Sequence, residues 1–174
     1  MSVVEVPRPP EVPGFPGPSR GDTLRLLWWA ERGFLHGART GRGGSRVYSA
    51  FLALMWWPAL PVLLVGQWWA LRRRSARYYF TPSRDAVLAL VANPNGWQVS
   101  EHYTAKPGAG RGRALREALV PLLLDEADRQ AVTVYGTAAT RSLARQYAAQ
   151  LPGVVDVGRG FYRGRRLQRL PSPR

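Results

Sequence analysis

The chain has 174 residues and a mass of 19.4 kDa, a size typical of one domain, which excludes a large multidomain enzyme. It contains no Cys and only two His, so the composition excludes a disulfide scaffold, a Cys-ligated metal site and thiol catalysis, and it does not indicate a metal centre. Lys and Arg total 25 against 11 acidic residues, giving a net charge of +14. We therefore expect an anionic partner, which is a nucleic acid, an acidic membrane or a phosphorylated small molecule.

The N-terminal part divides into two segments. Residues 1–20 hold six of the 15 prolines and few apolar side chains, which predicts a disordered or polyproline-like tail. Residues 21–46 begin with a candidate cap at Asp22 or Thr23 and continue as an amphipathic helix with Trp28 on its apolar side. A Gly/Arg-rich linker completes this segment.

Residues 47–71 form the most apolar stretch, 25 residues without a charged side chain. About 20 apolar residues suffice for a helix to cross a bilayer, and Arg72, which opens a run of three arginines, ends the stretch abruptly. This pattern predicts a transmembrane or membrane-inserted segment, and the slight excess of arginine after it places the C-terminal part in the cytoplasm. Pro58 and Pro61 would kink the segment or turn it back, and packing of the whole stretch against the following domain is the alternative.

Residues 72–174 have the pattern of a compact α/β domain. Two strand-like runs, 86–92 and 97–105, flank the turn sequence Asn-Pro-Asn-Gly and predict a β-hairpin. A Gly-rich loop, a helix from Arg113, a strand at 131–135, a helix carrying Tyr147 and a strand-like tail follow.

The Gly-rich loop between the second strand and its helix predicts an anion site. Its glycines allow close approach of a phosphate, the helix N-terminus offers unpaired amides, and the neighbouring arginines add positive charge. The loop lacks the Gly-Lys-Ser/Thr ending of a P-loop and the spacing and acidic partner of a dinucleotide fingerprint, which excludes the first and disfavours the second. A diphosphate fits the predicted site. The residues of the site are Gly108, Ala109, Gly110, Arg111, Gly112 and Arg113.

The run from Tyr103 to Leu119, with its Gly110-Arg111-Gly112-Arg113-Ala114-Leu115 core, resembles the acyl-CoA-binding motif of the GCN5-related N-acetyltransferases. The likeness continues to Leu170 and covers about 90 residues, with Pro107 where the family usually has Gln or Arg. The resemblance implies an α/β (α+β) fold, a mixed sheet with flanking helices preceded here by a hydrophobic helical segment. It also implies that the loop amides hold the pyrophosphate of acetyl-CoA, with no metal, and that Tyr147 protonates the leaving thiolate.

Two neighbouring residues of the second strand are candidate bases. Strict alternation places Glu101 on one face with Trp97, Val99 and Tyr103, and His102 on the other. Burial among apolar residues would raise the pKa of Glu101, whereas an imidazole has a suitable pKa without help.

Three functions fit these patterns. The first is a membrane-associated N-acyltransferase that moves an acetyl or other acyl group from acyl-CoA to an amine that the sequence does not identify. The second is a basic membrane protein that binds nucleic acid nonspecifically through the six arginines of residues 159–174. The third is an inactive interaction module with the same fold.

Overall fold

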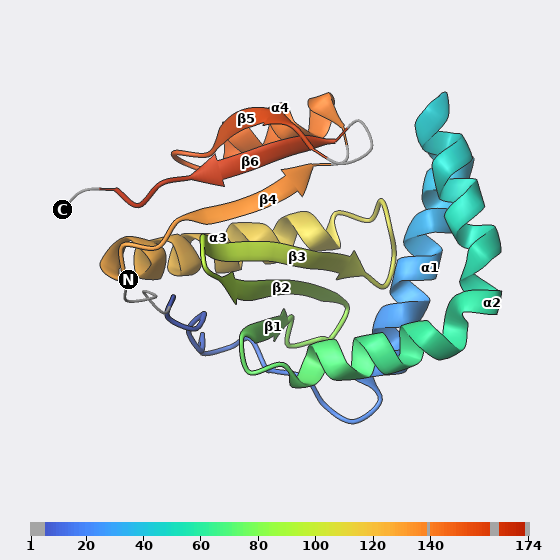
Figure 1. Ribbon diagram of the computed structural model, residues 1–174, viewed down its shortest axis with the longest axis horizontal. Helices are drawn as coiled ribbons and strands as arrows, with labels where there is room; N and C mark the ends of the chain where they lie inside the picture. Colours follow the sequence, from blue (N-terminus) through green and yellow to red (C-terminus); the bar gives the residue numbers. More distant parts are fainter. Residues whose placement is uncertain (1–5, 139, 161–163, 173–174) are drawn as a thin grey trace.

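The computed structural model describes residues 6–138, 140–160 and 164–172, which form a six-stranded mixed sheet flanked by helices (Figure 1). The strand order is β1-β2-β3-β4-β6-β5, and only the β3–β4 pair is parallel. An α/β fold of this kind is what the sequence predicts. The strands are β1 (Ala76–Phe80), β2 (Ala86–Asn93), β3 (Gly96–Thr104), β4 (Val134–Ala138), β5 (Val155–Arg159) and β6 (Arg165–Arg169). The helices are α1 (Asp22–Thr40), α2 (Gly44–Arg72), α3 (Arg111–Arg129) and α4 (Arg141–Gln150).

Each face of the sheet has its own apolar core. On one face, α3 packs its Leu115, Leu119 and Leu123 stripe against side chains of β2 and β3, with Trp97 fully buried between them. On the opposite face, Leu26 and Trp29 of α1 pack over β1 and β2. Because the central strands are covered on both sides, β2 is an almost continuous apolar run, as buried strands are.

A β-bulge in β3 corrects the expected distribution of its side chains. The pairing with β2 shifts between Glu101–Ala89 and Val99–Leu90, which leaves Ser100 as the extra residue on β3. Trp97 and Val99 therefore pack on the α3 face, while Glu101 lies on the α1 face. The prediction that these three residues share one face is wrong because a single unpaired residue reverses the alternation after it.

The apolar stretch forms one long helix, α2, that doubles back on α1. Ser49 of α2 lies where a side chain at Gly37 of α1 would sit, and the rings of Phe34 and Trp56 meet at 5.5 Å between centroids. Figure 1 shows α2 bending midway, near its two internal prolines, so that its C-terminal half runs beneath the sheet beside β1. Among the described residues, α2 is the helix with the length and apolar composition to cross a membrane.

The Pro-rich N-terminus is ordered where the structure describes it, which corrects the expected tail. Residues 6–20 run along the sheet without forming a helix or strand, and Pro9 is fully buried. Carbonyl groups of this segment accept hydrogen bonds from the indole of Trp97 and the hydroxyl of Tyr79, both at 2.7 Å. Prolines suit this role because an extended Pro-rich chain keeps its carbonyl groups free of internal bonds. Residues 1–5 lie outside the described part of the chain.

Candidate functional site

The sheet opens between β3 and β4. These parallel strands pair only at Trp97–Val134 and Gln98–Tyr135, after which β4 continues alongside β6 and the rest of β3 alongside β2. Beyond Gln98, the edge of β3 that faces β4 pairs with no strand in the described part of the chain. Strand amides and carbonyls at this edge are free to bond a ligand that enters the opening.

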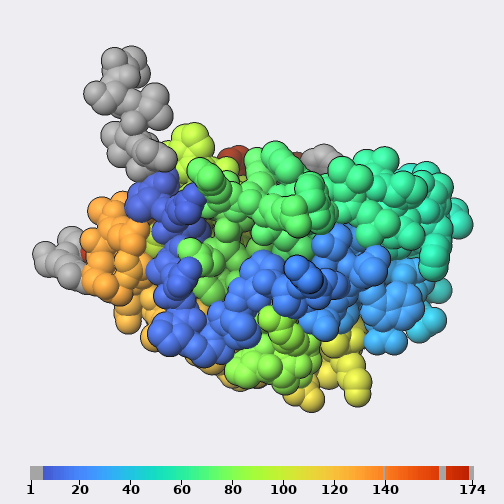
Figure 2. Space-filling model, turned by 90° about the horizontal axis from the view of Figure 1, so that it is seen from below, coloured from blue at the N-terminus to red at the C-terminus, as the bar shows by residue number. Residues whose placement is uncertain are grey.

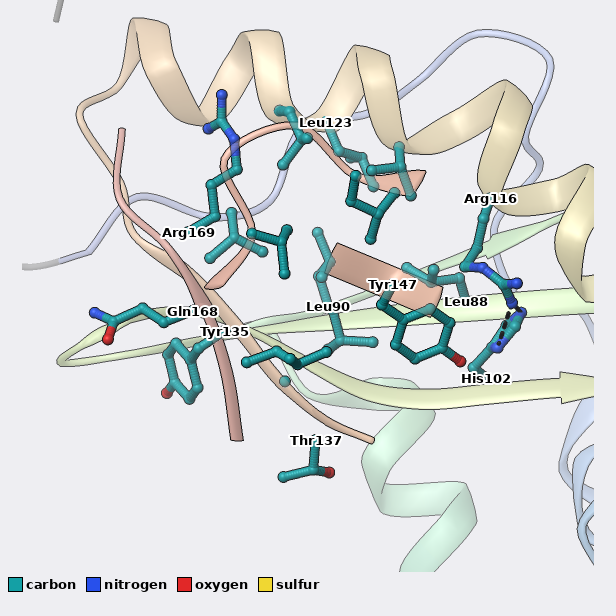
Figure 3. A pocket seen from close by; sticks show the side chains of 18 residues that line it. Leu88, Leu90, His102, Arg116, Leu123, Tyr135, Thr137, Tyr147, Gln168 and Arg169 are labelled. Atoms are coloured by element: carbon teal, nitrogen blue, oxygen red, sulfur yellow. Dashed lines mark hydrogen bonds between the residues drawn. The ribbon is translucent and has the colours of Figure 1, made fainter. Parts of the chain in front are cut away.

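A cavity of about 130 Å³ lies over this opening, between α3 and α4. Leu90, Leu123, Leu167 and other apolar side chains form most of its wall. Figure 3 shows His102, Arg116 and Tyr147 grouped at one end, and Gln168 and Arg169 at the other. The cavity therefore combines an apolar channel with polar groups at its ends, an arrangement typical of small-molecule sites.

His102 is a neutral imidazole at the end of the cavity that also holds Tyr147. Burial, followed by the nearby Arg116 guanidinium, lowers its pKa to about 4. Its Nε2 lies 3.2 Å from the carbonyl oxygen of Gly112, and a carbonyl only accepts, so Nε2 carries the proton and Nδ1 is left to face Arg116 at 3.4 Å. With that pKa, His102 is a weak base, contrary to the expectation that its ordinary pKa would serve.

Arg116 is a candidate functional residue that the sequence analysis missed. Its guanidinium lies 4.9 Å over the ring of Tyr147, and its buried Nε has no hydrogen-bond partner. A buried donor without a partner is costly, so a ligand acceptor in the cavity would be stabilised there. The signal in the sequence was an arginine directly after Leu115, beside the apolar stripe of α3.

Tyr147, expected as a proton donor, does lie in the cavity. It is half-buried on the face of α4 that carries the buried Ala144 and the half-buried Leu143, and its side chain lines the same space as His102. Thr140 caps this helix by accepting a bond from the amide of Leu143.

Glu101 lies on the opposite face of the sheet, apart from the other two candidates. Its carboxylate accepts hydrogen bonds from the Tyr78 hydroxyl at 3.1 Å and from the Gln67 amide at 3.2 Å. Burial raises the pKa of Glu101, although these two donors act against the shift. Gln67 comes from the apolar helix α2, and the sequence signal for it was a lone amide near the end of an apolar run.

The Gly-rich loop presents several free amides. Gly108 and Gly110 adopt left-handed φ values of 83° and 75°, which glycine adopts at no steric cost. The Gly110 carbonyl accepts the amides of Arg113 and Ala114. Across the described residues, four loop and first-turn amides have no hydrogen-bond partner, those of Gly108, Gly110, Arg111 and Gly112.

The side chains of Arg111 and Arg113, and the missing side chain of Gly112, have roles different from those of the free amides. Gly112 is buried inside α3, where a Cβ would come within 2.8 Å of the His102 ring, so this glycine permits close packing of helix and strand. Arg111 pairs with Asp85 at 2.8 Å, and Arg113 with Glu117 at 2.6 Å. Within the described part of the chain, no cluster of His, Asp or Glu has the composition of a metal site.

No protein-family model and no curated protein matches the chain. Among solved structures, the chain is similar to the PaiA N-acetyltransferase of Thermoplasma acidophilum, in complex with coenzyme A, with a TM-score of 0.55 at 10% identity over 90% of this chain and 97% of that one. It is also similar to an acetyltransferase of Thermus thermophilus, with a TM-score of 0.53 at 12% identity over 90% and 94% of the two chains. PH1933 of Pyrococcus horikoshii matches with a TM-score of 0.54 at 12% identity over 94% and 99%. The chain thus has the fold of the GCN5-related N-acetyltransferases.

Proposed function

We propose that the chain is an acyl-CoA-dependent N-acyltransferase that moves an acetyl or other acyl group to an amine. The observation that carries the proposal is the alignment of two sites along one path. Free amides at the start of α3 suit a diphosphate, and the opening between β3 and β4 leads from them to a cavity with a proton donor and an unpartnered guanidinium nitrogen. The coenzyme A bound to the similar PaiA structure supports this assignment.

In the proposed complex, the amides of Gly108, Gly110 and Arg111 hold the pyrophosphate of acyl-CoA. The helix dipole of α3 adds favourable potential, and Ala109, Gly112 and Arg113 complete the loop. The unpaired edge of β3 then aligns the thioester arm, and Arg116 supplies a donor to it from the cavity.

The chemistry is attack of an amine nitrogen on the thioester carbonyl. Glu101, whose raised pKa makes it a stronger base than an exposed carboxylate, accepts the proton that the amine loses, directly or through water. The tetrahedral intermediate then collapses with cleavage of the C–S bond, and the Tyr147 hydroxyl protonates the leaving thiolate. The products are an amide and free CoA. Positioning and strand amides supply most of the stabilisation.

Thermal unfolding with acetyl-CoA tests the proposal, and two variants at one position control it. Gly110 has open space around it, and both Asp and Asn tolerate its left-handed backbone. We expect acetyl-CoA to raise the Tm of the parent chain. Gly110→Asp, which places a negative charge in the loop, should abolish this shift, while Gly110→Asn should retain most of it. A parent chain without any shift would favour an inactive module.

Membrane association through residues 47–71 is the second part of the proposal. Helix α2 supports it because nine of its large apolar side chains are exposed, and because its C-terminus carries a run of arginines. The arginine excess after the helix supports a cytoplasmic position of the domain. Full-length protein should sediment with membranes, and its recovery in a detergent-free supernatant would contradict this part alone.

A further inference from the structure

The exposed side of α2 is one continuous apolar face. Phe51, Leu54, Val62, Val65 and Trp69 recur at helical spacing, with Pro58 between the second and third, and each of the five is 55 to 76% exposed. The outer surface of α1 exposes two more large apolar side chains, Leu24 and Trp28, and Figure 2 shows the two helices side by side on one side of the molecule. We call this surface the outer face.

The opposite side of α2 packs against the rest of the protein. Trp56 packs on Phe34 of α1, and Leu71 packs on the core beneath β1. Gln67 bonds Glu101 and Tyr78 of the sheet. The three polar side chains between residues 47 and 71 that are not indoles, Tyr48, Ser49 and Gln67, are all half-buried. Between residues 47 and 71, the outer face therefore carries no charged or hydroxyl group, while this chain fills the inner side.

This division argues against a crossing. A helix that spans a bilayer in this arrangement would take α1 with it, and α1 carries Arg25, Glu31, Arg32 and Arg39. It would also draw the buried Glu101 cluster toward hydrocarbon. A helix lying in the interface, with its apolar side toward lipid and its other side on the domain, meets neither difficulty.

The borders of the outer face indicate anionic lipid as its occupant. Arg72 and Arg73 stack on Trp68 and Trp69 at 4.1 and 4.2 Å, and Arg32 stacks on Trp28 at 5.0 Å. Indole rings prefer the headgroup level, and guanidinium groups beside them meet lipid phosphates. A second copy of this chain, with a net charge of +14, would instead bring two sets of arginines together.

We propose that the outer face of α1 and α2 seats the protein flat on an anionic bilayer, with α2 in the plane of the interface and both of its ends on the same side. The inference rests on the membrane association proposed above and does not depend on the acyltransferase activity.

Vesicle flotation of the full-length protein tests the seat. Vesicles of phosphatidylcholine with phosphatidylglycerol should bind it, and removal of arginines 72–74 one at a time should weaken binding by roughly fivefold each. Val62→Glu should weaken binding by about tenfold or more, because it puts a charge on the apolar face. Leu170→Glu, similarly exposed but outside the face, is the matched control. Failure to bind these vesicles would overturn both the flat seating and the membrane association. The same holds if the protein self-associates instead of binding vesicles and Val62→Glu abolishes that self-association.

Side-specific labelling separates a seat from a crossing. The chain has no Cys, so single cysteines at the exposed Arg42 and Ser83 can be labelled with an impermeant maleimide on sealed membranes from producing cells. The two positions lie before and after α2. We expect both to react in inside-out vesicles and neither in right-side-out vesicles. Reaction of the two positions from opposite sides would overturn the seat while preserving membrane association.

Discussion

On the two faces of the sheet, burial shifts the pKa values of two adjacent β3 residues in opposite directions. On the α3 face, His102 borders a cavity and burial lowers its pKa to about 4. On the α1 face, Glu101 is enclosed by Tyr78 and Gln67 and burial raises its pKa. Desolvation disfavours the charged form in both cases, so it weakens an imidazole as a base and strengthens a carboxylate. In the proposed mechanism, the α1 face accepts the proton and the α3 face binds acyl-CoA.

Replacement of the Glu101 carboxylate should have the largest effect. Glu101→Gln keeps the size of the side chain but removes the base, and we expect acyl transfer to fall by about 10²–10⁴-fold with little change in Tm. The rate of thiol release from acetyl-CoA in the presence of a panel of amines measures this loss of acyl transfer. The exposed Glu117→Gln is the control. Full activity in Glu101→Gln together with loss in His102→Gln would reverse the assignment of the two faces.

Disrupting the close packing of α3 against β3 should have the next largest effect. A methyl group on Gly112 would stand 2.8 Å from the His102 ring and 3.1 Å from Thr104, so Gly112→Ala should cost about 1–3 kcal/mol of unfolding free energy. Gly33→Ala, in α1 with nothing within 4 Å, should instead be neutral or stabilise by about 0.4–1 kcal/mol. Urea unfolding compares the two. Equal effects would mean that Gly112 is not a packing glycine.

The buried imidazole predicts a pH dependence of stability. The folded pKa of His102, about 4, lies below the ordinary imidazole pKa of 6.5, so the unfolded chain binds more protons between these values. Stability is therefore full above pH 6.5 and falls as the pH drops toward 4. Between pH 7 and pH 5 this residue accounts for about 2 kcal/mol. Urea unfolding at pH 7 and pH 5 should show a smaller loss of stability in His102→Gln than in the parent.

Local sequence patterns predicted much of the domain. The hairpin of β2 and β3, the Gly-rich loop, α3 and the placement of Tyr147 on a helix follow from periodicity and turn residues. The expected order began one strand late, because β1 is a short run of aromatic residues beside the arginines and shows no alternation of burial.

The features that the sequence did not predict depend on tertiary structure. Nothing local marks Ser100 as a bulge, yet that one residue separates Glu101 from Trp97 and Val99. The order of residues 6–20 depends on distant donors, and proline content alone favours disorder. Helix α2 has the composition of a membrane span, but its packing on α1 and on the sheet is visible only in the fold. Composition shows that a segment is apolar, whereas only tertiary contacts show what each side of the helix packs against.

The smallest expected effect concerns the link between the apolar helix and the carboxylate. Gln67 donates to Glu101 and so holds its pKa down against burial. Gln67→Leu removes the donor but keeps the packing volume, so the pKa of Glu101 should rise further. Its titration midpoint should therefore move to higher pH. Carbon-13 NMR of the labelled Glu carboxyl measures this directly. Val65→Leu, on the outer face of the same helix, should leave the titration unchanged. If Gln67→Leu also leaves it unchanged, α2 does not reach the base, and the α1 face works without the apolar helix.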